Sequence, residues 1–322
     1  MTTASNKMQY ARVGNSGLRV SKLIVGCMSF GDTRWYDWVL EGEEAMKHIK
    51  AAYDLGLNTF DTADAYSNGQ SERLLGQAIK KYNIPREKSG YSNQYGLNRK
   101  HIFAAVKDSL ERLQVDYIDV LQCHRYDPNT PIEETMQALH DVVKAGYVRY
   151  IGMSSCFAYQ FHIMQNYAIN NKLTPFISMQ NHYSLVYREE EREMFPTLKH
   201  FGVGAFPWSP LARGALTRPL SEQTKRGNSD NWSKALKAQP CTEAIVARVE
   251  EIAKKHSASM AQIALAWVLS RPGVTAPIVG TSNLKNLEDL VGALSIELTE
   301  EEKKYLGEEY RAQALFNHIQ AE

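Results

Sequence analysis

The stretch from residue 58 to residue 82, NTFDTADAYSNGQSERLLGQAIKKY, contains a strand, a polar loop and a helix in direct succession. Asn58–Asp61 is a short run that ends in a carboxylate, and Ser71–Tyr82 repeats its apolar residues at the spacing of one helix face. A strand followed at once by a helix is half of a βαβ unit, in which the strands pair in parallel. This stretch therefore favours an α/β fold.

The same alternation continues along the chain in both directions. Further strands are predicted at Leu23–Met28, Tyr117–Gln122, Val148–Ser154, Phe176–Gln180, Val203–Trp208 and Ala276–Gly280. Further helices are predicted at Glu43–Leu55, Arg99–Leu113, Ile132–Ala145, Ala158–Asn170, Arg192–Lys199, Thr242–His256, Ser259–Leu269, Asn283–Ala293 and Thr299–Tyr310. Alternating strands and helices over 322 residues predict a (β/α)8 TIM barrel, although the pattern supplies seven strands where a closed barrel needs eight.

Two segments stand outside this alternation. Met8–Lys22 carries the turn signal Gly14-Asn-Ser-Gly17 between short alternating runs, which predicts an N-terminal β-hairpin. Pro210–Pro240 is polar and poorly periodic, which predicts one long loop. No linker or repeat interrupts the chain, so we expect a single barrel domain over residues 1–322.

Composition excludes several classes of partner. Lys and Arg number 37 against 36 Asp and Glu, so the net charge of +1 gives no reason to expect nucleic acid or a membrane as a partner. No signal peptide and no apolar run of about 20 residues is found. The four cysteines lack metal-ligand spacing, and no metal site is expected. Reduced thiols are typical of a cytoplasmic protein. Composition does not reveal the oligomeric state.

Polar side chains stand where the predicted strands end, which is where barrels of this kind place their active sites. In chain order these ends carry Asp61, His124, Ser154, Ser155, Gln180 and Trp208, with Tyr66 five residues after the first of them. Each has a purely structural alternative: a turn cap for the acid, a core position for the imidazole, turns for the hydroxyls, loop pairing for the amide and packing for the indole. Their convergence on one rim favours a ligand site.

Seven motifs in this order resemble the aldo-keto reductases, in particular the fungal members related to aryl-alcohol dehydrogenases. The likeness covers nearly the whole chain. The motifs are LIVGCMSFG at 23–31, NTFDTADAYSNGQSERLLGQAI at 58–79, DYIDVLQCHRYD at 116–127, VRYIGMSS at 148–155, SMQNHYS at 178–184, FPWSPLARG at 206–214 and PIVGTSN at 277–283. The resemblance implies an NADPH-binding barrel that reduces a small carbonyl substrate, an aldehyde or a ketone, to an alcohol.

The resemblance also implies a role for each matched residue. Asp61, Tyr66 and His124 would form the catalytic group, together with a lysine at the end of the third strand. Apart from the resemblance, the aromatic side chains of Phe30, Trp35 and Tyr36 would line an apolar mouth that suits an aryl aldehyde, although Trp35 and Tyr36 have the alternative of packing a loop. The cofactor would be held by Gly26 and Met28, by Ser154, Ser155 and Gln180 at its nicotinamide carboxamide, and by Trp208 stacked on the nicotinamide ring. Ser209, Leu211, Arg213 and Gly214 would lie along the pyrophosphate, and the adenosine end would face Gly280, Ser282, Asn286 and Asp289. The family often has Asn after the last of these, where this chain has Leu290.

Reduction of a carbonyl explains these residue types. The carbonyl oxygen needs a proton as hydride reaches the carbon, but a phenol has an unperturbed pKa of about 10. A buried lysine beside Tyr66 would lower that pKa, and Asp61 would hold the lysine by a charge-assisted hydrogen bond. His124 would orient the carbonyl group.

The predicted third strand is missing, and its lysine with it. Asn83–Leu97 contains no run of four apolar residues. In relatives, the Arg-Glu-Lys after the second helix leads into an apolar strand that ends in Thr-Lys. Here Arg86-Glu-Lys88 runs directly into the polar stretch Ser89–Gly96, which we interpret as an internal deletion. Ser89–Gln94 would then form a poor strand in the gap, with Gln94 near the position of the lysine.

The loss predicts a weakened enzyme. Tyr66 would lack its activating cation, and Asp61 would become an unpaired buried carboxylate with a raised pKa. The polar strand would also bury little apolar area, which predicts a marginal fold. The chain would be an impaired NADPH-dependent reductase. Two alternatives remain open: a non-catalytic NADP(H)-binding or regulatory protein on the same barrel, and a deletion product without a stable fold.

Overall fold

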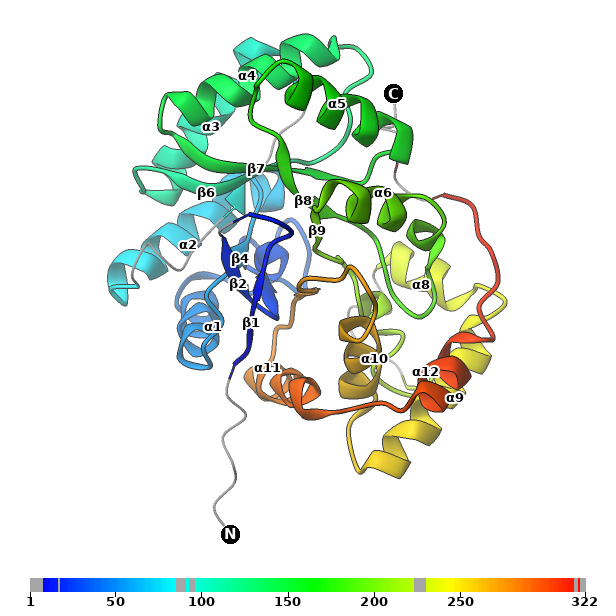
Figure 1. The fold of residues 1–322 in the computed structure, drawn as a ribbon. Helices are drawn as coiled ribbons and strands as arrows, with labels where there is room; N and C mark the ends of the chain where they lie inside the picture. The colour runs from blue at the N-terminus through cyan, green and yellow to red at the C-terminus, as the bar shows by residue number, and fades with distance from the viewer. Residues whose placement is uncertain are drawn as a thin grey trace.

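The strands of the computed structural model follow one another in chain order and run parallel around the centre of the molecule (Figure 1). The structure describes residues 8–16, 18–84, 91–92, 96–222, 230–315 and 318. Within them the parallel strands are β3 (Ile24–Gly26), β4 (Phe60–Asp61), β5 (Tyr91–Ser92), β6 (Ile118–Cys123), β7 (Val148–Ser154), β8 (Phe176–Gln180), β9 (Gly204–Ala205) and β10 (Ile278–Val279). The prediction of a (β/α)8 architecture is thereby confirmed.

The parallel strands form two hydrogen-bonded groups that are joined on one side. The ladders run β10-β3-β4 and β5-β6-β7-β8-β9. Backbone hydrogen bonds connect the segment around β10 to the segment around β9, because Thr275 N donates to Ala205 O at 2.9 Å and Ile278 N donates to Pro207 O at 2.7 Å. On the other side, no ladder joins β4 to β5 within the described part of the chain. Within the described residues, the two ladders are therefore joined on one side.

Helices surround the strands (Figure 1). They are α1 (Gly42–Asp54), α2 (Gln70–Lys81), α3 (Arg99–Leu113), α4 (Ile132–Lys144), α5 (Ala158–Asn170), α6 (Met194–Phe201), α8 (Asn231–Lys237), α9 (Thr242–His256), α10 (Met260–Leu269), α11 (Leu284–Val291) and α12 (Glu300–Gly307). Short 3-10 turns are η1 (Cys27–Ser29), η2 (Tyr66–Gly69), η4 (Glu189–Glu191), η5 (Ala212–Gly214) and η6 (Gly292–Ser295). Apolar residues at helical spacing turn one face of these helices towards the sheet.

The predicted N-terminal hairpin is present and packs under the barrel. β1 (Tyr10–Arg12) pairs antiparallel with β2 (Arg19–Ser21). In the turn, Gly14 has a φ of +51°, and a Cβ atom there would lie 2.2 Å from Gly202 O. Only glycine permits this close approach. Val13 and Val20 are buried with Phe206 in the apolar cluster inside the barrel, so the hairpin covers one end of it.

Strand β6 separates two apolar environments. Val120 is fully buried in the cluster inside the barrel, together with Phe206 and Ile278. Leu121 and Cys123 belong instead to the large cluster that lies between the sheet and the helices. Alternate side chains of one strand point to opposite faces, so both faces of this parallel sheet are buried, as the near-continuous apolar runs predicted.

A short strand, β5, lies between α2 and α3, in the stretch where the sequence shows no apolar strand pattern. The backbone of Tyr91–Ser92 pairs in parallel with Val120 and Leu121 of β6. Lys88 and Gln94, which entered the prediction of a polar strand, lie outside the described residues. The part that the structure describes agrees with a short strand and leaves the upper half of β6 without a partner on that side among the described residues.

The prediction of one long loop over Pro210–Pro240 is wrong. This region contains η5 and the helix α8. Asp230 caps α8, because its side chain accepts hydrogen bonds from the backbone of Trp232 and Ser233. The helical pattern of α8 is weak because the helix is only seven residues long. The other predicted elements are present, and the strands β3, β4, β9 and β10 are shorter than predicted: β4 holds Phe60–Asp61 alone.

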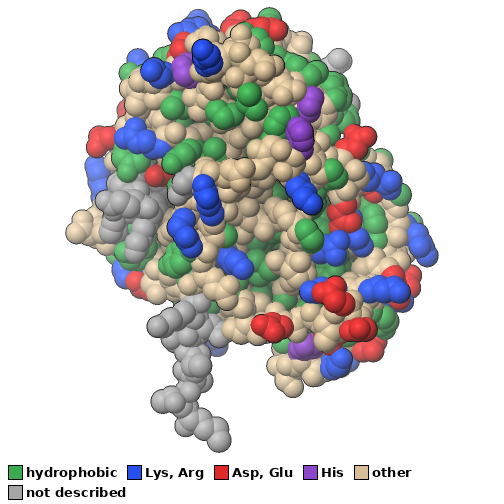
Figure 2. Space-filling model, viewed as in Figure 1, with side chains coloured by type: hydrophobic (Ala, Val, Ile, Leu, Met, Phe, Trp, Pro, Cys, Tyr) green, Lys and Arg blue, Asp and Glu red, His purple; other side chains and the backbone are tan. Residues whose placement is uncertain are grey.

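The nearly equal numbers of basic and acidic residues are reflected in the distribution of charge on the surface. Lys and Arg side chains are interspersed with Asp and Glu on the face shown in Figure 2. All four cysteines are free thiols, and all four are buried. None of the helices in the described ranges combines the length and the apolar character that a membrane span needs.

Helix α2 packs on α3 at a glycine, which gives a test of this packing. A Cβ atom at Gly76 would lie 2.4 Å from the backbone oxygen of Leu113. Gly76→Ala improves helix propensity by about 1 kcal/mol, but the backbone contact cannot yield, and overpacking costs about 1–3 kcal/mol. We expect a lower melting temperature by circular dichroism, whereas the exposed neighbour variant Gln77→Ala should melt like the wild type. A G76A protein as stable as the wild type would contradict this packing.

Candidate active site

The structure joins the predicted site residues through an unbroken series of contacts at the carboxyl ends of the strands. Asp61 ends β4, His124 follows β6, Ser154 ends β7 and Gln180 ends β8. Ser154 and Gln180 are register partners, and Ser154 Oγ donates to the backbone oxygen of Gln180 at 2.9 Å. The Tyr66 and His124 rings lie 6.5 Å apart, edge to face. Residues that lie 119 positions apart in the sequence are thus brought to one rim.

Asp61 is buried and is bonded to an amide. Its side chain is 8% exposed, and Gln180 Nε2 donates to its Oδ1 at 2.9 Å. Burial raises the pKa of Asp61 to about 7, and the hydrogen bond from Gln180 opposes that rise only in part. The predicted increase of this pKa is confirmed. Among the described residues Asp61 forms no ion pair, and the hydrogen bond that Gln180 from β8 donates to it across the barrel mouth was not predicted.

Among the described residues, no cation acts on Tyr66 strongly enough to make its phenol acidic. Burial and the neighbouring Asp61 raise its pKa well above the ordinary value. Arg125 and Arg213 act in the opposite direction, but their effect is smaller. Within the described residues, no lysine forms a hydrogen bond or an ion pair with Asp61 or Tyr66. The phenol is therefore fully protonated at neutral pH.

His124 stands beside Tyr66 as a neutral imidazole. Burial and the adjacent Arg125 lower the pKa of His124 to about 4. Arg125 was not among the predicted site residues. Its guanidinium donates to His124 O and approaches Ser154 Oγ at 3.4 Å, which links the ends of β6 and β7. Its place directly after His124 in the motif was the available signal. A neutral imidazole can donate a hydrogen bond to a carbonyl oxygen without adding charge.

Trp208 is held in a stack of three rings. His182 lies 4.3 Å from Trp208 with 10° between the ring planes, and 4.3 Å from Tyr187 with 14° between them. Trp208 Nε1 also donates to Ser155 Oγ at 3.1 Å. His182 is 1% exposed, and burial lowers its pKa to about 3, so the stack carries no charge. His182 was not among the predicted site residues, because it lies two residues beyond the end of β8.

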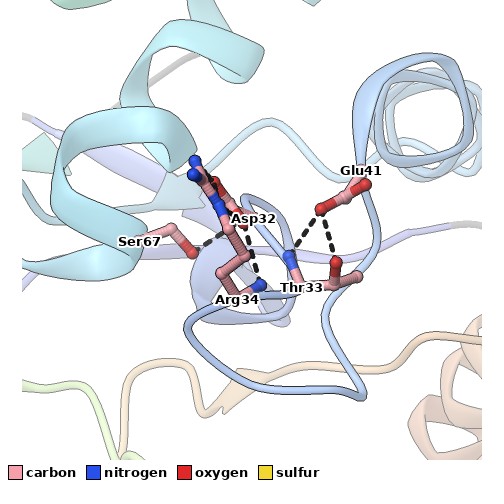
Figure 3. A network of polar contacts seen from close by, with 5 residues as sticks. All are labelled: Asp32, Thr33, Arg34, Glu41 and Ser67. Atoms are coloured by element: carbon pink, nitrogen blue, oxygen red, sulfur yellow. Dashed lines mark hydrogen bonds and ion pairs between the residues drawn. The ribbon is translucent and has the colours of Figure 1, made fainter.

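The loop after β3 carries the predicted substrate residues and is tied to the turn that holds Tyr66. Asp32 N donates to Ser67 Oγ at 3.1 Å, and Glu41 Oε1 accepts from Thr33 N at 2.6 Å and from Thr33 Oγ1 at 2.8 Å (Figure 3). Arg34 pairs with Asp32 within the same loop. These bonds fix both ends of a segment that would otherwise be an open loop.

The predicted substrate residues differ in how close they lie to the phenol. The Trp35 ring lies 6.1 Å from the Tyr66 ring. Tyr36 packs on Trp35 at 4.7 Å and stacks on Trp38 at 5.2 Å, and it is 43% exposed. Phe30 is buried with its ring 6.1 Å from His48 of α1. The geometry favours Trp35 over the other two as a wall of a substrate site, and Phe30 as a packing residue.

The predicted pyrophosphate residues lie on the segment after β9. Ser209 and Arg213 adopt left-handed backbone angles, with φ of +52° and +54°, and Leu211 and Gly214 stand between and after them. Arg213 forms an ion pair with Asp230 at 2.6 Å, and its guanidinium lies 5.2 Å from the Trp232 ring centre. The side chain that would meet the phosphates is thus engaged with the N-terminus of α8.

At the predicted adenosine end, most residues are open. Gly280, Ser282 and Asn286 are exposed. Asp289 instead accepts a hydrogen bond from Ser259 Oγ at 2.6 Å. At the end of the neighbouring strand β3, Gly26 is buried, and a Cβ atom at Gly280 would lie 3.3 Å from Gly26 O. Met28 in the following turn η1 is half-buried. The described residues include no group of His, Cys, Asp and Glu arranged to hold a metal ion.

The raised pKa of Asp61 predicts a pH dependence of stability. In the folded chain this pKa is about 7, against 3.8 for an ordinary carboxyl. As the pH rises from about 4 to about 7, the unfolded chain releases the proton first, so folding stability is lost across this window. Asp61→Asn removes the charge and keeps an oxygen for Gln180. We expect D61N to exceed the wild type by about 2–4 kcal/mol at pH near 8 and to match it at pH near 4 in urea titrations.

The exposed carboxyl of Asp108 on α3 provides the control for that prediction. Asp108→Asn should change stability little at either pH, because no burial opposes its charge. A D61N gain that is equal at both pH values would show that the gain has another origin than the buried charge.

Comparison with known proteins gives the family. Residues 22–310 match the model of the aldo/keto reductase family. The chain is 47% identical to an aldo-keto reductase of Fusarium vanettenii, with 97% of this chain and 94% of the relative covered. It is 49% identical to a Schizosaccharomyces pombe protein whose name proposes an aryl-alcohol dehydrogenase, with 94% and 95% covered. It is 46% identical to versiconal hemiacetal acetate reductase of Aspergillus parasiticus, with 96% and 98% covered.

These relatives contain residues that this chain lacks. The comparison with the Fusarium protein extends over 348 positions, which exceeds the 322 residues of the chain. The family generally uses NAD(P)H, and the names of the relatives support an oxidoreductase. With the barrel, the ordered motifs and a family match over most of its length, the chain belongs to the aldo/keto reductase family.

Proposed function

We propose that this protein is an NADPH-dependent reductase of small aldehydes or ketones, aryl aldehydes among them, with a turnover reduced by the loss of the catalytic lysine. The observation that carries the proposal is the connected set Asp61, Gln180, Ser154, His124 and Tyr66 at one rim of the barrel. The name of the Aspergillus relative as a reductase, and of the Schizosaccharomyces relative as an aryl-alcohol dehydrogenase, supports the carbonyl chemistry. We expect residues 1–322 to form one catalytic domain, and we expect the protein to be located in the cytoplasm.

The residues at the rim fit a nicotinamide dinucleotide. The indole of Trp208 is covered by His182 on one face, so a nicotinamide ring would take the opposite face. The hydroxyls of Ser154 and Ser155 and the amide of Gln180 are the donors and acceptors that a carboxamide needs. Arg213 would meet the pyrophosphate. When bound, NADPH would supply hydride to the carbonyl carbon.

The side chains of this chain would then handle the carbonyl oxygen. His124, neutral because burial lowers its pKa to about 4, would donate a hydrogen bond that orients the oxygen. Tyr66 would give the oxygen its proton as hydride reaches the carbon, which yields the alcohol. Trp35, with its ring 6.1 Å from Tyr66, would offer an apolar wall to an aromatic substrate.

The same geometry supports a slow reaction. A phenol whose pKa lies far above neutrality transfers its proton poorly, since catalytic groups work best with a pKa near the operating pH. In the described residues the partner of Asp61 is the uncharged Gln180, where the family has a lysine. Gln180 also cannot hold Asp61 and a carboxamide with the same amide hydrogen. Both features favour weak turnover.

The absence of a lysine beside Asp61 among the described residues also supports a second function. A barrel that keeps the cofactor residues and lacks the lysine would suit a non-catalytic NADP(H)-binding or regulatory protein. The two proposals share the cofactor and differ in turnover, so one pair of measurements separates them.

Tyr66 provides the decisive variant. We expect Tyr66→Phe to lower the rate of NADPH oxidation with an aryl aldehyde by at least about 100-fold, because it removes the proton donor and keeps the ring. NADPH binding, followed by fluorescence titration, should change little. Tyr159→Phe removes the phenol of a residue that is 61% exposed on α5 and should leave both measurements unchanged.

The outcomes separate the alternatives. NADPH binding without any aldehyde reduction in the wild type would favour the non-catalytic protein. No NADPH binding in a chain that is folded by circular dichroism would contradict both proposals. Turnover that survives in Y66F would place the proton donor elsewhere.

A further inference from the structure

The turn that follows Tyr66 has a left-handed backbone. Ser67 has a φ of +48° and a ψ of +40°, and Asn68 has a φ of +51° and a ψ of +49°. Gly69 continues the turn with a φ of +80°. Left-handed angles are unfavourable for any residue with a Cβ atom, and they are usually adopted by single residues. A backbone of this kind persists only where the surrounding structure holds it in place.

The loop that contains this turn is closed at its base by two buried hydroxyl groups. Thr62 directly follows β4, and Ser71 lies at the start of α2. Thr62 Oγ1 and Ser71 Oγ are hydrogen-bonded at 2.9 Å, and Ser71 Oγ donates to the backbone oxygen of Cys27 at 2.8 Å. Both hydroxyl-bearing residues are buried. Because the base is fixed, the direction of the Tyr66 side chain depends on the backbone at the tip of the loop.

On one side, the tip is held by the loop that follows β3. Ser67 is buried, and its Oγ accepts the hydrogen bond from Asp32 N at 3.1 Å (Figure 3). The two segments approach so closely that a Cβ atom at Gly31 would lie 2.1 Å from Ser67 Oγ. Trp35 follows Asp32 by three residues. The hydroxyl of Ser67 therefore ties the left-handed turn to the loop that carries the predicted substrate residues.

On the other side, the turn lies against α3. A Cβ atom at Gly69 would lie 2.8 Å from Cδ of Arg112. Arg112 forms an ion pair with Glu72 of α2, whose side chain is fully buried. A buried ion pair and the helix that carries it cannot yield easily. The turn is thus restrained by packing on this side and by the hydroxyl of Ser67 on the opposite side.

The phenol that this turn carries must be placed accurately. The Tyr66 ring lies 6.1 Å from the Trp35 ring and 6.5 Å from the His124 ring. A proton donor has to come within hydrogen-bond reach of the oxygen that it protonates. A misplacement by about 1 Å can lower a rate about 100-fold.

We propose, on the basis of the proposed role of Tyr66 as the proton donor, that Ser67 is a positioning residue for this phenol. Its hydroxyl keeps the left-handed turn in place by accepting from Asp32 N, and the turn directs the phenol towards the carbonyl oxygen. Without the hydroxyl, the turn relaxes towards ordinary backbone angles and the phenol moves. The predicted cofactor residues at the ends of β7 and β8 stay where they are, so kcat changes and NADPH affinity does not.

Two substitutions act on the turn in different ways. Ser67→Ala removes the acceptor of Asp32 N, and we expect kcat for aldehyde reduction to fall about 10–100-fold. Asn68 is exposed, so a substitution there acts through the backbone. Asn68→Val introduces a β-branched residue that left-handed angles disfavour, and it should lower kcat in the same way. Asn68→Gly should keep the kcat of the wild type, because glycine adopts these angles freely. NADPH binding, followed by fluorescence titration, should be unchanged in all three.

Lys172 provides the control for a merely structural effect. It is exposed, with a φ of +57°, in the turn between α5 and β8. This turn precedes a strand, so it lies at the end of the barrel opposite to the rim. Lys172→Val imposes a similar backbone strain and should lower the melting temperature as N68V does, without changing kcat. A wild-type kcat in S67A and N68V, or an equal loss of kcat in K172V and N68V, would overturn the proposal.

Fluorine NMR tests the position of the phenol without turnover. In protein labelled with fluorotyrosine, the Tyr66 signal is identified by its loss in Y66F. We expect one signal for Tyr66 in the wild type, N68G and K172V, and a broadened or second signal in S67A and N68V. An unchanged Tyr66 signal in both S67A and N68V would overturn the positioning role, even in a chain without reductase activity. The expected signals in an enzyme whose turnover survives Y66F would support the positioning role and contradict only the proposed proton donor.

Discussion

The hydrogen bond from Gln180 to Asp61 is the interaction on which the rest of the site depends. It joins the ends of β4 and β8 across the barrel mouth at 2.9 Å. A buried carboxylate needs either a cation or several donors to stay ionised. A single neutral amide gives it less than that, and its pKa accordingly stays near 7. The charge state of Asp61, and through it the acidity of Tyr66, follows from which side chain reaches this carboxyl.

The remaining contacts hold that arrangement in place. Ser154 fixes the backbone of Gln180, and Ser67 fixes the loop that carries Trp35 beside Tyr66. His182 and Ser155 fix the plane of Trp208 from two directions. Each tie links a strand end to a loop that follows a different strand. A rim built in this way is pre-organised for a flat ligand, which favours positioning as its contribution to catalysis.

Much of the fold could be read from the sequence because strand and helix periodicities alternate without ambiguity. The strands that are buried on both faces, such as Val148–Ser154 and Phe176–Gln180, were predicted with their observed bounds. The helix Asn231–Lys237 was missed, since seven residues give too few turns to show a period. Likewise, β5 has two residues and carries no pattern of its own; only its position between two helices indicated it.

The site could be predicted in its members but not in all its pairings. The strand-end rule and the motifs brought Asp61, Tyr66, His124 and Trp208 to one rim, as the structure has them. Which side chain meets Asp61 depends on distances across the barrel, and periodicity contains no information about these. The lost lysine was the only partner considered for the carboxyl of Asp61, and Gln180 was predicted to hold the cofactor. The hydrogen bond between Gln180 and Asp61 was therefore not predicted.

The carboxyl and the phenol of the rim are not independent of each other. Burial keeps the pKa of Asp61 near 7, and the neutral amide of Gln180 opposes that rise only in part. Asp61 in turn raises the pKa of Tyr66. Because Asp61 gains or loses its proton near neutral pH, the field that it exerts on the phenol changes in the same range of pH. The hydrogen bond that joins the ends of β4 and β8 therefore also acts on the proton donor of the proposed reaction.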